Sequence, residues 1–248
     1  ALRLGVPVVP GSHGLLADEN QALEVARQIG FPIILKAAHG GGGKGIVVVE
    51  NEDSFVAKFL RIKAEARSSF GRDDIYLERF VTRFRHIEVQ LLRDGQGNAQ
   101  VIGLRDCSVQ RNKQKIIEES GSTMLPADKA ILAKECAAKL AEACNYHGAG
   151  TVEYIYDLDR DQLYFMEMNT RLQVEHPVTE LVSGVNIVHK QFDIARGGSI
   201  EDLAYGDNGY AMEVRINAEQ VSVKNGEIIV EPTPGKVEAC DFPRQEDI

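Results

Sequence analysis

The sequence of 248 residues predicts an α+β fold. Two observations carry this prediction: stretches in which apolar residues recur at helical spacing, and a series of short apolar runs joined by turns rather than by helices. Strands that follow one another through tight turns pair antiparallel. We therefore predict a small lid over residues 1–80 and a larger body built on antiparallel sheet over residues 81–248.

In the lid, a helix is expected over residues 18–30, because an aspartate at its start can cap it and a glycine at its end can stop it. A strand, a glycine loop and a second strand follow over residues 31–50. A second helix then runs from about residue 51 to residue 70, and Gly71 closes it. The lid is thus a strand–loop–strand unit flanked by helices.

In the body, the expected strands cover residues 75–80, 86–93, 99–105, 151–156 and 163–168. A helix with apolar residues at helical spacing is expected over residues 126–147, ended by Gly148. The turn DGQGN at residues 94–98 joins two of the strands. These elements favour antiparallel pairing in the body.

The composition argues against several classes of function. A formal net charge of -9 argues against nucleic acid as the main partner. The four cysteines form no CxxC pair, so neither a zinc site nor a disulfide scaffold is indicated. Apolar runs are strand-sized and no targeting leader is recognised, so we expect no membrane segment. A reducing compartment fits best, either the cytoplasm or, in a eukaryote, the mitochondrial matrix.

The segment HGGGGKG at residues 39–45 can turn several backbone N–H groups toward an anion. The alternative is a flexible hairpin tip. A position between two apolar strands, with Lys36 before the loop and Lys44 in it, favours phosphate binding. The loop is not the Walker type, which would open a helix after GK and Ser or Thr.

A group of oxygen ligands lies near one strand. Glu167 and Asn169 are two residues apart and are expected on one face together with Phe165 and Leu163, with Glu153 in reach from the partner strand. Two carboxylates and an amide oxygen are the hard ligands that Mg²⁺ takes beside nucleotide phosphates. The alternative is a solvated sheet face, and the neighbouring glycine loop makes magnesium the better explanation.

A polar loop, MNTRLQVEHP at residues 168–177, leaves that strand. Arg171 could clamp a small planar oxyanion, and Glu175 could act as a base on it. The alternative is an Arg–Glu surface pair, with Pro177 starting a helix. The residues alone leave both interpretations open.

Taken together, four segments closely resemble the biotin carboxylase family. They are Lys36 with HGGGGKG, RHIEVQ at residues 85–90, RDCSVQR at residues 105–111 and EMNTRLQVEHPVTE at residues 167–180. The last is the most specific, because related ligases share its metal-binding Glu and Asn but not the QVEHPVTE continuation. The resemblance covers nearly the whole chain. It implies an ATP-grasp fold and the ATP-dependent carboxylation of biotin by bicarbonate through carboxyphosphate.

The resemblance also implies a role for each matching residue. ATP would be bound by Lys36, Gly42, Gly43, Glu78, Arg79, Phe80, Val81, His86, Gln110 and Lys113. Magnesium, as two ions, would be held by Glu153, Glu167 and Asn169. Bicarbonate would be bound by Lys115, Arg171, Gln173 and the backbone of Val174, with Glu175 as its base and Lys115 steadying the carboxyphosphate. Arg215 would bind biotin and stabilise its enolate.

One departure lies in the site: Lys113 stands where the family usually has a histidine, which keeps the charge but loses a titratable acceptor. Family members have a Rossmann-like domain before the position of Ala1 and continue past Ile248. The resemblance therefore implies that the chain is a central fragment, inactive alone. Its partners would be a biotin carboxyl carrier and carboxyltransferase domains or subunits, with no nucleic acid and no membrane. Whether the full-length parent is a homodimer is left open.

Two other functions remain in view. Another ATP-grasp carboxylate–amine ligase would have no need for Arg215. A catalytically silent nucleotide-binding or interaction module is opposed by the intact set of residues that the resemblance places in the site.

Overall fold

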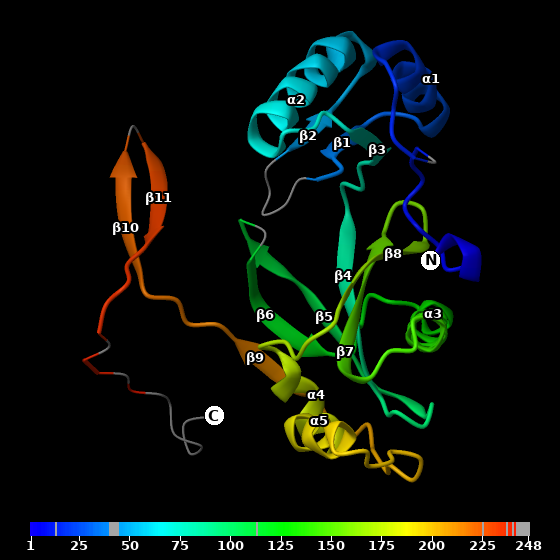
Figure 1. Ribbon diagram of the computed structural model, residues 1–248. Coiled ribbons are helices and arrows are strands. Elements are labelled where there is room, and N and C mark those ends of the chain that lie inside the picture. The colour runs from blue at the N-terminus through cyan, green and yellow to red at the C-terminus, as the bar shows by residue number, and fades with distance from the viewer. Residues whose placement is uncertain are drawn as a thin grey trace.

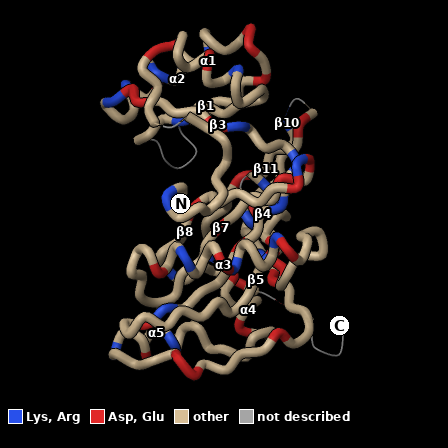
Figure 2. Tube along the Cα trace, turned by 90° about the vertical axis from the view of Figure 1, so that its right-hand side faces the viewer, with Lys and Arg blue, Asp and Glu red and all other residues tan. Residues whose placement is uncertain are grey.

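The computed structural model describes residues 1–12, 14–39, 45–112, 114–224, 226–236, 238, 239 and 241. A lid and a body lie one above the other, and a separate two-stranded hairpin stands beside them (Figure 1). A view from the side again shows the lid above the body, with acidic and basic residues interspersed along both (Figure 2). Helices and antiparallel sheets together confirm the predicted α+β class.

The lid is a three-stranded antiparallel sheet, in the order β2-β1-β3, covered on one face by two helices (Figure 1). Its elements are α1 (Glu19–Ile29), β1 (Ile33–Ala37), β2 (Ile46–Val49), η2 (Glu52–Ser54), α2 (Phe55–Phe70) and β3 (Ile75–Arg79). The Asp18 carboxylate accepts hydrogen bonds from the backbone N–H groups of Asn20 and Gln21, and Gly30 follows the last turn, so both predicted ends of α1 are confirmed.

The alternation of side chains along β1 determines which residues of the lid face the body. Ile33, Leu35 and Ala37 are buried in the lid core, beneath the helices. A strand has a side-chain period of two, so Ile34 and Lys36 lie on the opposite face. That face looks toward the body and lines the cavity described below.

The body is a six-stranded antiparallel sheet in the order β8-β7-β4-β5-β6-β9. Its strands are β4 (Phe84–Arg93), β5 (Ala99–Arg111), β6 (Gln114–Ser120), β7 (Gly148–Asp157), β8 (Gln162–Asn169) and β9 (Met212–Val214). Helix α3 (Ala127–Ala143) covers one face, while α4 (His176–Ser183) and α5 (Ile187–Ala195) lie at the other side of the sheet (Figure 1). The short helix η1 (Leu2–Leu4) and the hairpin of β10 (Glu219–Lys224) and β11 (Glu227–Pro232) complete the described elements.

Two boundaries in the body differ from prediction. The helix predicted over residues 126–147 ends at Ala143, because Asn145 takes a positive φ of 48°. Gly148 does not end the helix; with φ of 105°, it opens β7. The strand predicted over residues 99–105 continues to Arg111, so that RDCSVQR lies on β5 and pairs with β6.

The start of the chain contacts the body before the chain enters the lid. Val6 is buried in the core cluster that α3 covers, and the backbone N–H of Phe165 donates to the carbonyl of Pro7 at 2.7 Å. The division into residues 1–80 and 81–248 stays a prediction. Within the described ranges, no helix is both long and apolar enough to cross a bilayer.

Candidate functional site

A cavity of about 950 Å³ lies between the lid and the body. It brings together every predicted site residue that the structure describes: Lys36, Glu78, Arg79, Phe80, Val81, His86, Gln110, Lys115, Glu153, Glu167, Asn169, Arg171, Gln173, Val174, Glu175 and Arg215. Gly42, Gly43 and Lys113 lie outside the described residues, as does most of the glycine loop with its hairpin-tip alternative. Residues from both halves of the chain therefore face one space.

The lid end of the cavity combines a cation with apolar walls. The Nζ of Lys36 donates to Oε2 of Glu78 at 2.5 Å and lies 5.9 Å from the centre of the Tyr76 ring. Apolar side chains face one another across the space: Ile34, Ile46 and Val48 from the lid, and Phe84, Ile155 and Met166 from the body. Such walls suit a flat heteroaromatic ring, with the cation beside it. The sequence prediction named none of these six, although alternation along β1 and β2 signals the first three.

The hinge over residues 78–81 lines the same end. The backbone N–H of Arg79 donates to the carbonyl of Pro10, and that of Phe80 donates to the carbonyl of Pro32. These two donors are therefore already engaged by the protein itself. The hinge is fixed on both sides where the chain passes from lid to body.

A β-bulge in β8 corrects one prediction. Glu153 pairs with Glu167, but the next residue, Tyr154, pairs with Phe165, so Met166 is an extra residue in β8. Leu163 and Phe165 pack in the core beneath α3, whereas Met166, Glu167 and Asn169 line the cavity. The prediction that Glu167 shares a face with Phe165 and Leu163 was wrong, because the bulge reverses the alternation.

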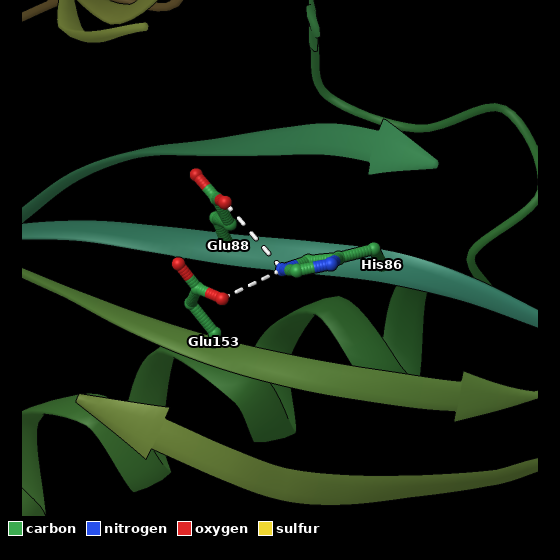
Figure 3. A group of neighbouring side chains, drawn as sticks. All are labelled: His86, Glu88 and Glu153. Carbon is green, nitrogen blue, oxygen red and sulfur yellow. Dashed lines mark hydrogen bonds and ion pairs between the residues drawn. The ribbon is translucent and has the colours of Figure 1, made fainter. Parts of the chain in front are cut away.

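His86 and Glu153 form a buried pair at the centre of the site (Figure 3). The His86 Nε2 lies 2.9 Å from Glu153 Oε2 and 3.5 Å from Glu88 Oε1. The Nε2 of Gln110 contacts His86 Nδ1 at 3.0 Å; since an amide nitrogen only donates, Nδ1 accepts and the ring proton sits on Nε2. His86 is thereby held as a donor toward Glu153.

Electrostatics keep Glu153 ionised. Burial raises the pKa of this carboxyl, but the hydrogen bond from His86, the charge of Lys115 and the hydrogen bond from Gln173 lower the pKa to about 2. Gln173 Nε2 also donates to Glu153 Oε1 at 2.7 Å, and Asn169 Nδ2 donates to it at 2.8 Å. The alternative of a solvated sheet face does not describe Glu153, which is buried.

Lys115 joins three carboxylates. Its Nζ donates to Glu175 at 2.7 Å, to Glu153 at 3.2 Å and, in a short contact, to Glu88. Burial lowers the pKa of Lys115, but the charges of Glu88 and Glu153 outweigh burial, so the pKa is raised overall. Lys115 is therefore a fixed positive charge in the body wall.

Glu175 and Arg215 form an ion pair in the wall of the cavity. Burial raises the pKa of Glu175, but the hydrogen bond from Lys115 lowers it, and the net pKa is below its ordinary value. Arg215 Nη2 donates to Glu175 Oε2 at 2.9 Å, while its Nε donates to the buried Glu118 at 2.6 Å. Glu175 is thus an ionised carboxylate between two cations.

One of the two parts of the alternative interpretation of residues 171–177, the helix start at Pro177, agrees with the structure. Pro177 stands in the first turn of α4, so the helix start is confirmed. The Arg–Glu surface pair of that alternative is not what the described residues form. Arg171 Nη1 donates to the carbonyl of Leu172, and Glu175 is buried against Lys115 and Arg215.

The donor set at Glu153, Glu167 and Asn169 fits a hard cation. Glu153 is ionised, Glu167 is exposed to the cavity, and the Asn169 amide nitrogen lies 2.8 Å from Glu153 and 3.5 Å from Glu167. Turning this amide by half a turn would bring its oxygen, the atom that Mg²⁺ accepts as a ligand, to the same point between the two carboxylates. These three residues would hold Mg²⁺. The buried cluster His86, Glu88 and Glu153 also offers ligand atoms, but Lys115 and Arg105 already neutralise Glu88 there.

Three buried charged residues that contact the side chains of the site were missed from the sequence: Glu88, Arg105 and Glu118. Glu88 lies opposite Arg105 on one neighbouring strand and opposite Glu153 on the other. A signal exists, because RHIEVQ and RDCSVQR place charges inside apolar strands. Without the strand register, these charges have no assigned partners.

Comparison with known proteins agrees with this geometry. The family described as carbamoyl-phosphate synthase L chain, ATP binding domain, matches residues 1–203. Biotin carboxylase 1 of Bacillus subtilis is 44% identical over 237 residues, which cover 94% of this chain and 51% of the relative. The biotin carboxylase of a Nostoc species is 46% identical over 239 residues, covering 95% of this chain and 52% of the relative. The chain thus spans about half the length of the curated relatives it matches.

Solved structures agree as well. A biotin carboxylase–beta-gamma-ATP complex from Campylobacter jejuni has a TM-score of 0.80 and 45% identity, covering 88% of this chain and 49% of that one. The biotin carboxylase domain dimer of Hydrogenobacter thermophilus 2-oxoglutarate carboxylase, with MgADP, ADP and bicarbonate, has a TM-score of 0.78 and 41% identity, covering 91% and 53%. The chain therefore belongs to the family of the carbamoyl-phosphate synthase L chain ATP-binding domain and, within it, is a relative of the biotin carboxylases with their ATP-grasp fold.

Proposed function

We propose that this chain binds MgATP and activates bicarbonate within a biotin-dependent carboxylase. The overall reaction converts ATP, bicarbonate and biotin into ADP, phosphate and N-carboxybiotin through carboxyphosphate. One observation carries the proposal: the nucleotide, metal, bicarbonate and biotin residues expected from sequence line one cavity between lid and body. Because the chain spans about half the length of the curated relatives it matches, we expect it to be inactive alone.

The lid end takes the nucleotide. The apolar walls enclose the adenine ring, with the hinge of Glu78 to Val81 at its edge. Lys36 leaves Glu78 and pairs with the phosphates, because the triphosphate as a whole offers more negative charge than one carboxylate. His86 and Gln110 contact the ribose and phosphates from the body side. Magnesium at Glu153, Glu167 and Asn169 would neutralise charge on the phosphate oxygens when bound.

The body end takes bicarbonate. Arg171, Gln173 and the backbone of Val174 orient the anion, and Glu175 removes its proton. The oxygen freed in this way attacks the γ-phosphorus, the bond to ADP breaks, and carboxyphosphate forms. Lys115 stabilises the negative charge on carboxyphosphate from its fixed position beside Glu175. The protein mainly positions the reactants and compensates charge, which is what phosphoryl transfer requires.

Biotin binds beside Arg215, whose Nη2 and Nε are held by Glu175 and Glu118. The guanidinium faces the ureido oxygen and stabilises negative charge as biotin becomes an enolate. The biotin arrives on a carboxyl carrier and leaves for a carboxyltransferase, both on other domains or subunits. The compartment is the cytoplasm, or the mitochondrial matrix in a eukaryote.

The test is bicarbonate-dependent ATP cleavage by the full-length parent, measured as ADP release with and without free biotin. Bicarbonate should stimulate ADP release, and biotin should raise it further and become carboxylated. Cleavage that depends on an amine and a carboxylic acid instead would identify another ATP-grasp ligase. MgATP binding without any turnover would identify a silent binding module.

A further inference from the structure

The two faces of the body sheet differ in polarity. The face beneath α3 is apolar, with Ile87, Val89 and Leu91 of β4 in its core. The opposite face, toward α4, carries buried polar side chains on three adjacent strands: Glu88, Gln90, Arg105, Thr151 and Glu153. Burying so many polar groups is costly unless each has partners. Arg105 supplies most of these partnerships.

Arg105 has no solvent exposure, and all three of its guanidinium nitrogens donate to side chains. Nε and Nη2 donate to Glu88 Oε2 at 3.2 and 3.0 Å. Nη1 donates to Gln90 Oε1 and to Thr179 Oγ1, both at 2.9 Å. Nη2 also reaches Thr151 Oγ1 at 3.4 Å and Gln173 Oε1 at 3.1 Å. One side chain thus links two strands, helix α4 and the loop that precedes it.

A glycine lets α4 approach closely enough for these contacts. Gly103 lies two residues before Arg105 on β5, and a Cβ at this position would stand 2.8 Å from Thr179 Cγ2. Without that Cβ, Thr179 rests directly on β5 beside Arg105. The loop over residues 171–175 is thereby held against the sheet at the bicarbonate end of the cavity.

The contact with Gln173 fixes which end of its carboxamide faces the cavity. A guanidinium only donates hydrogen bonds, so Gln173 must turn its oxygen toward Arg105. Its NH₂ group then points the other way and donates to Glu153 Oε1 at 2.7 Å. The reversed amide would place NH₂ against the guanidinium and oxygen against a carboxylate, losing both bonds.

We propose that Arg105 is a positioning residue that holds the Gln173 NH₂ group toward the cavity, where one N–H donates to Glu153 and the second N–H is presented to the bound oxyanion. This inference rests on the proposed function, because it deepens the account of the bicarbonate site. Arg105 does not line the cavity and touches no reactant; it acts through Gln173. Lysine cannot replace it, since one ammonium group cannot reproduce the planar fork that reaches Glu88, Gln90 and Gln173 together.

The main variant is Arg105→Lys in the full-length parent, which keeps the charge beside Glu88. The Michaelis constant for bicarbonate should rise roughly tenfold or more, as is usual when a supporting hydrogen bond is lost, while that for ATP changes less than about twofold. The matched control is Arg93→Lys, another buried arginine on the sheet, which donates to Asn145 and Tyr146 and does not line the cavity. It should leave both constants within about twofold, even where it lowers the melting temperature equally.

A double-mutant cycle tests whether Arg105 acts on bicarbonate binding through Gln173. Gln173→Ala alone should raise the bicarbonate constant, and adding Arg105→Lys should raise it less than about twofold further. Additive effects, or equal rises for ATP and bicarbonate, would overturn the proposal. Where Arg105→Lys does not fold, Thr179→Val carries the test, because it removes one bond that holds the guanidinium. An unchanged bicarbonate constant in that variant would then overturn the proposal.

A separate readout distinguishes this inference from the proposed function. The side-chain NH₂ signals of Gln173, identified by their loss in Gln173→Ala, should shift in Arg105→Lys and stay in place in Arg93→Lys. A wild-type parent without bicarbonate-dependent ATP cleavage would refute the proposed function. Unmoved Gln173 signals would refute the role of Arg105, whatever the activity.

Discussion

Replacing Lys115 by methionine should raise the pKa of Glu175. The Lys115 hydrogen bond, at 2.7 Å, is the largest influence that lowers this pKa, and burial already acts in the opposite direction. Loss of an opposite charge at such a distance typically moves a carboxyl by about 1 to 3 pH units. Because a base must be ionised to accept a proton, the acid limb of the pH–rate profile should move upward by a similar amount.

The same change should destabilise the fold. Breaking a buried ion pair typically costs about 3–5 kcal/mol. The lower end applies here, because Glu153 keeps His86 and Glu175 keeps Arg215 as partners. The matched control is Lys129→Met, which removes the same charge from a pairing with the exposed Asp161 and should cost about 1 kcal/mol or less.

The assay is a carbon-13 NMR titration of the glutamate carboxyl groups, with Glu175→Gln used to identify the Glu175 signal, together with urea unfolding. An upward shift of Glu175 in Lys115→Met but not in Lys129→Met is the expected result. A Glu175 pKa that stays in place, or moves equally in both variants, would refute the electrostatic account of this site.

Two further predictions concern the other carboxylates. Glu167→Gln should remove most of the magnesium dependence of nucleotide binding, because an anionic ligand is lost; equal MgATP affinity by calorimetry on the full-length parent would rule out the metal assignment. Glu153→Gln should change the stability of the fold in acid. The pKa of Glu153 is about 2 in the folded protein and 4.5 ordinarily. The ionised carboxylate therefore stabilises the fold above about pH 4.5 by on the order of 3 kcal/mol, and this contribution is lost as the pH falls toward 2. The difference in unfolding free energy between wild type and Glu153→Gln should therefore shrink over that range, and a constant difference would count against the depressed pKa.

Local signals made the lid predictable from the sequence. Asp18 and Gly30 bound α1 as their capping chemistry requires. Alternation along β1 separates the buried Ile33, Leu35 and Ala37 from Lys36. Both are nearest-neighbour effects, which depend on a few consecutive residues and not on the rest of the fold.

The site was only partly predictable, because its remaining features depend on pairing between distant strands. The residues around Met166 carry no sequence signal for the bulge, because the same residues could form a regular strand. Glu88 and Arg105 become partners only through the β4–β5 register. Glu118 meets Arg215 across 97 positions of sequence. Charges inside apolar strands signal that partners exist, but they do not say which residues these are.

We propose that one cavity activates bicarbonate with Glu175 and receives biotin at Arg215. The decisive measurement follows ADP release and carboxybiotin formation side by side in the full-length parent for Arg215→Ala and Glu175→Gln. Arg215→Ala should reduce carboxylation of free biotin by roughly a hundredfold or more, because a guanidinium oriented at a developing oxyanion is removed. Bicarbonate-dependent ATP cleavage should fall much less in that variant, whereas Glu175→Gln should depress both activities. Equal loss of both activities in Arg215→Ala would contradict the account, since Arg215 would then serve the nucleotide or bicarbonate and not biotin.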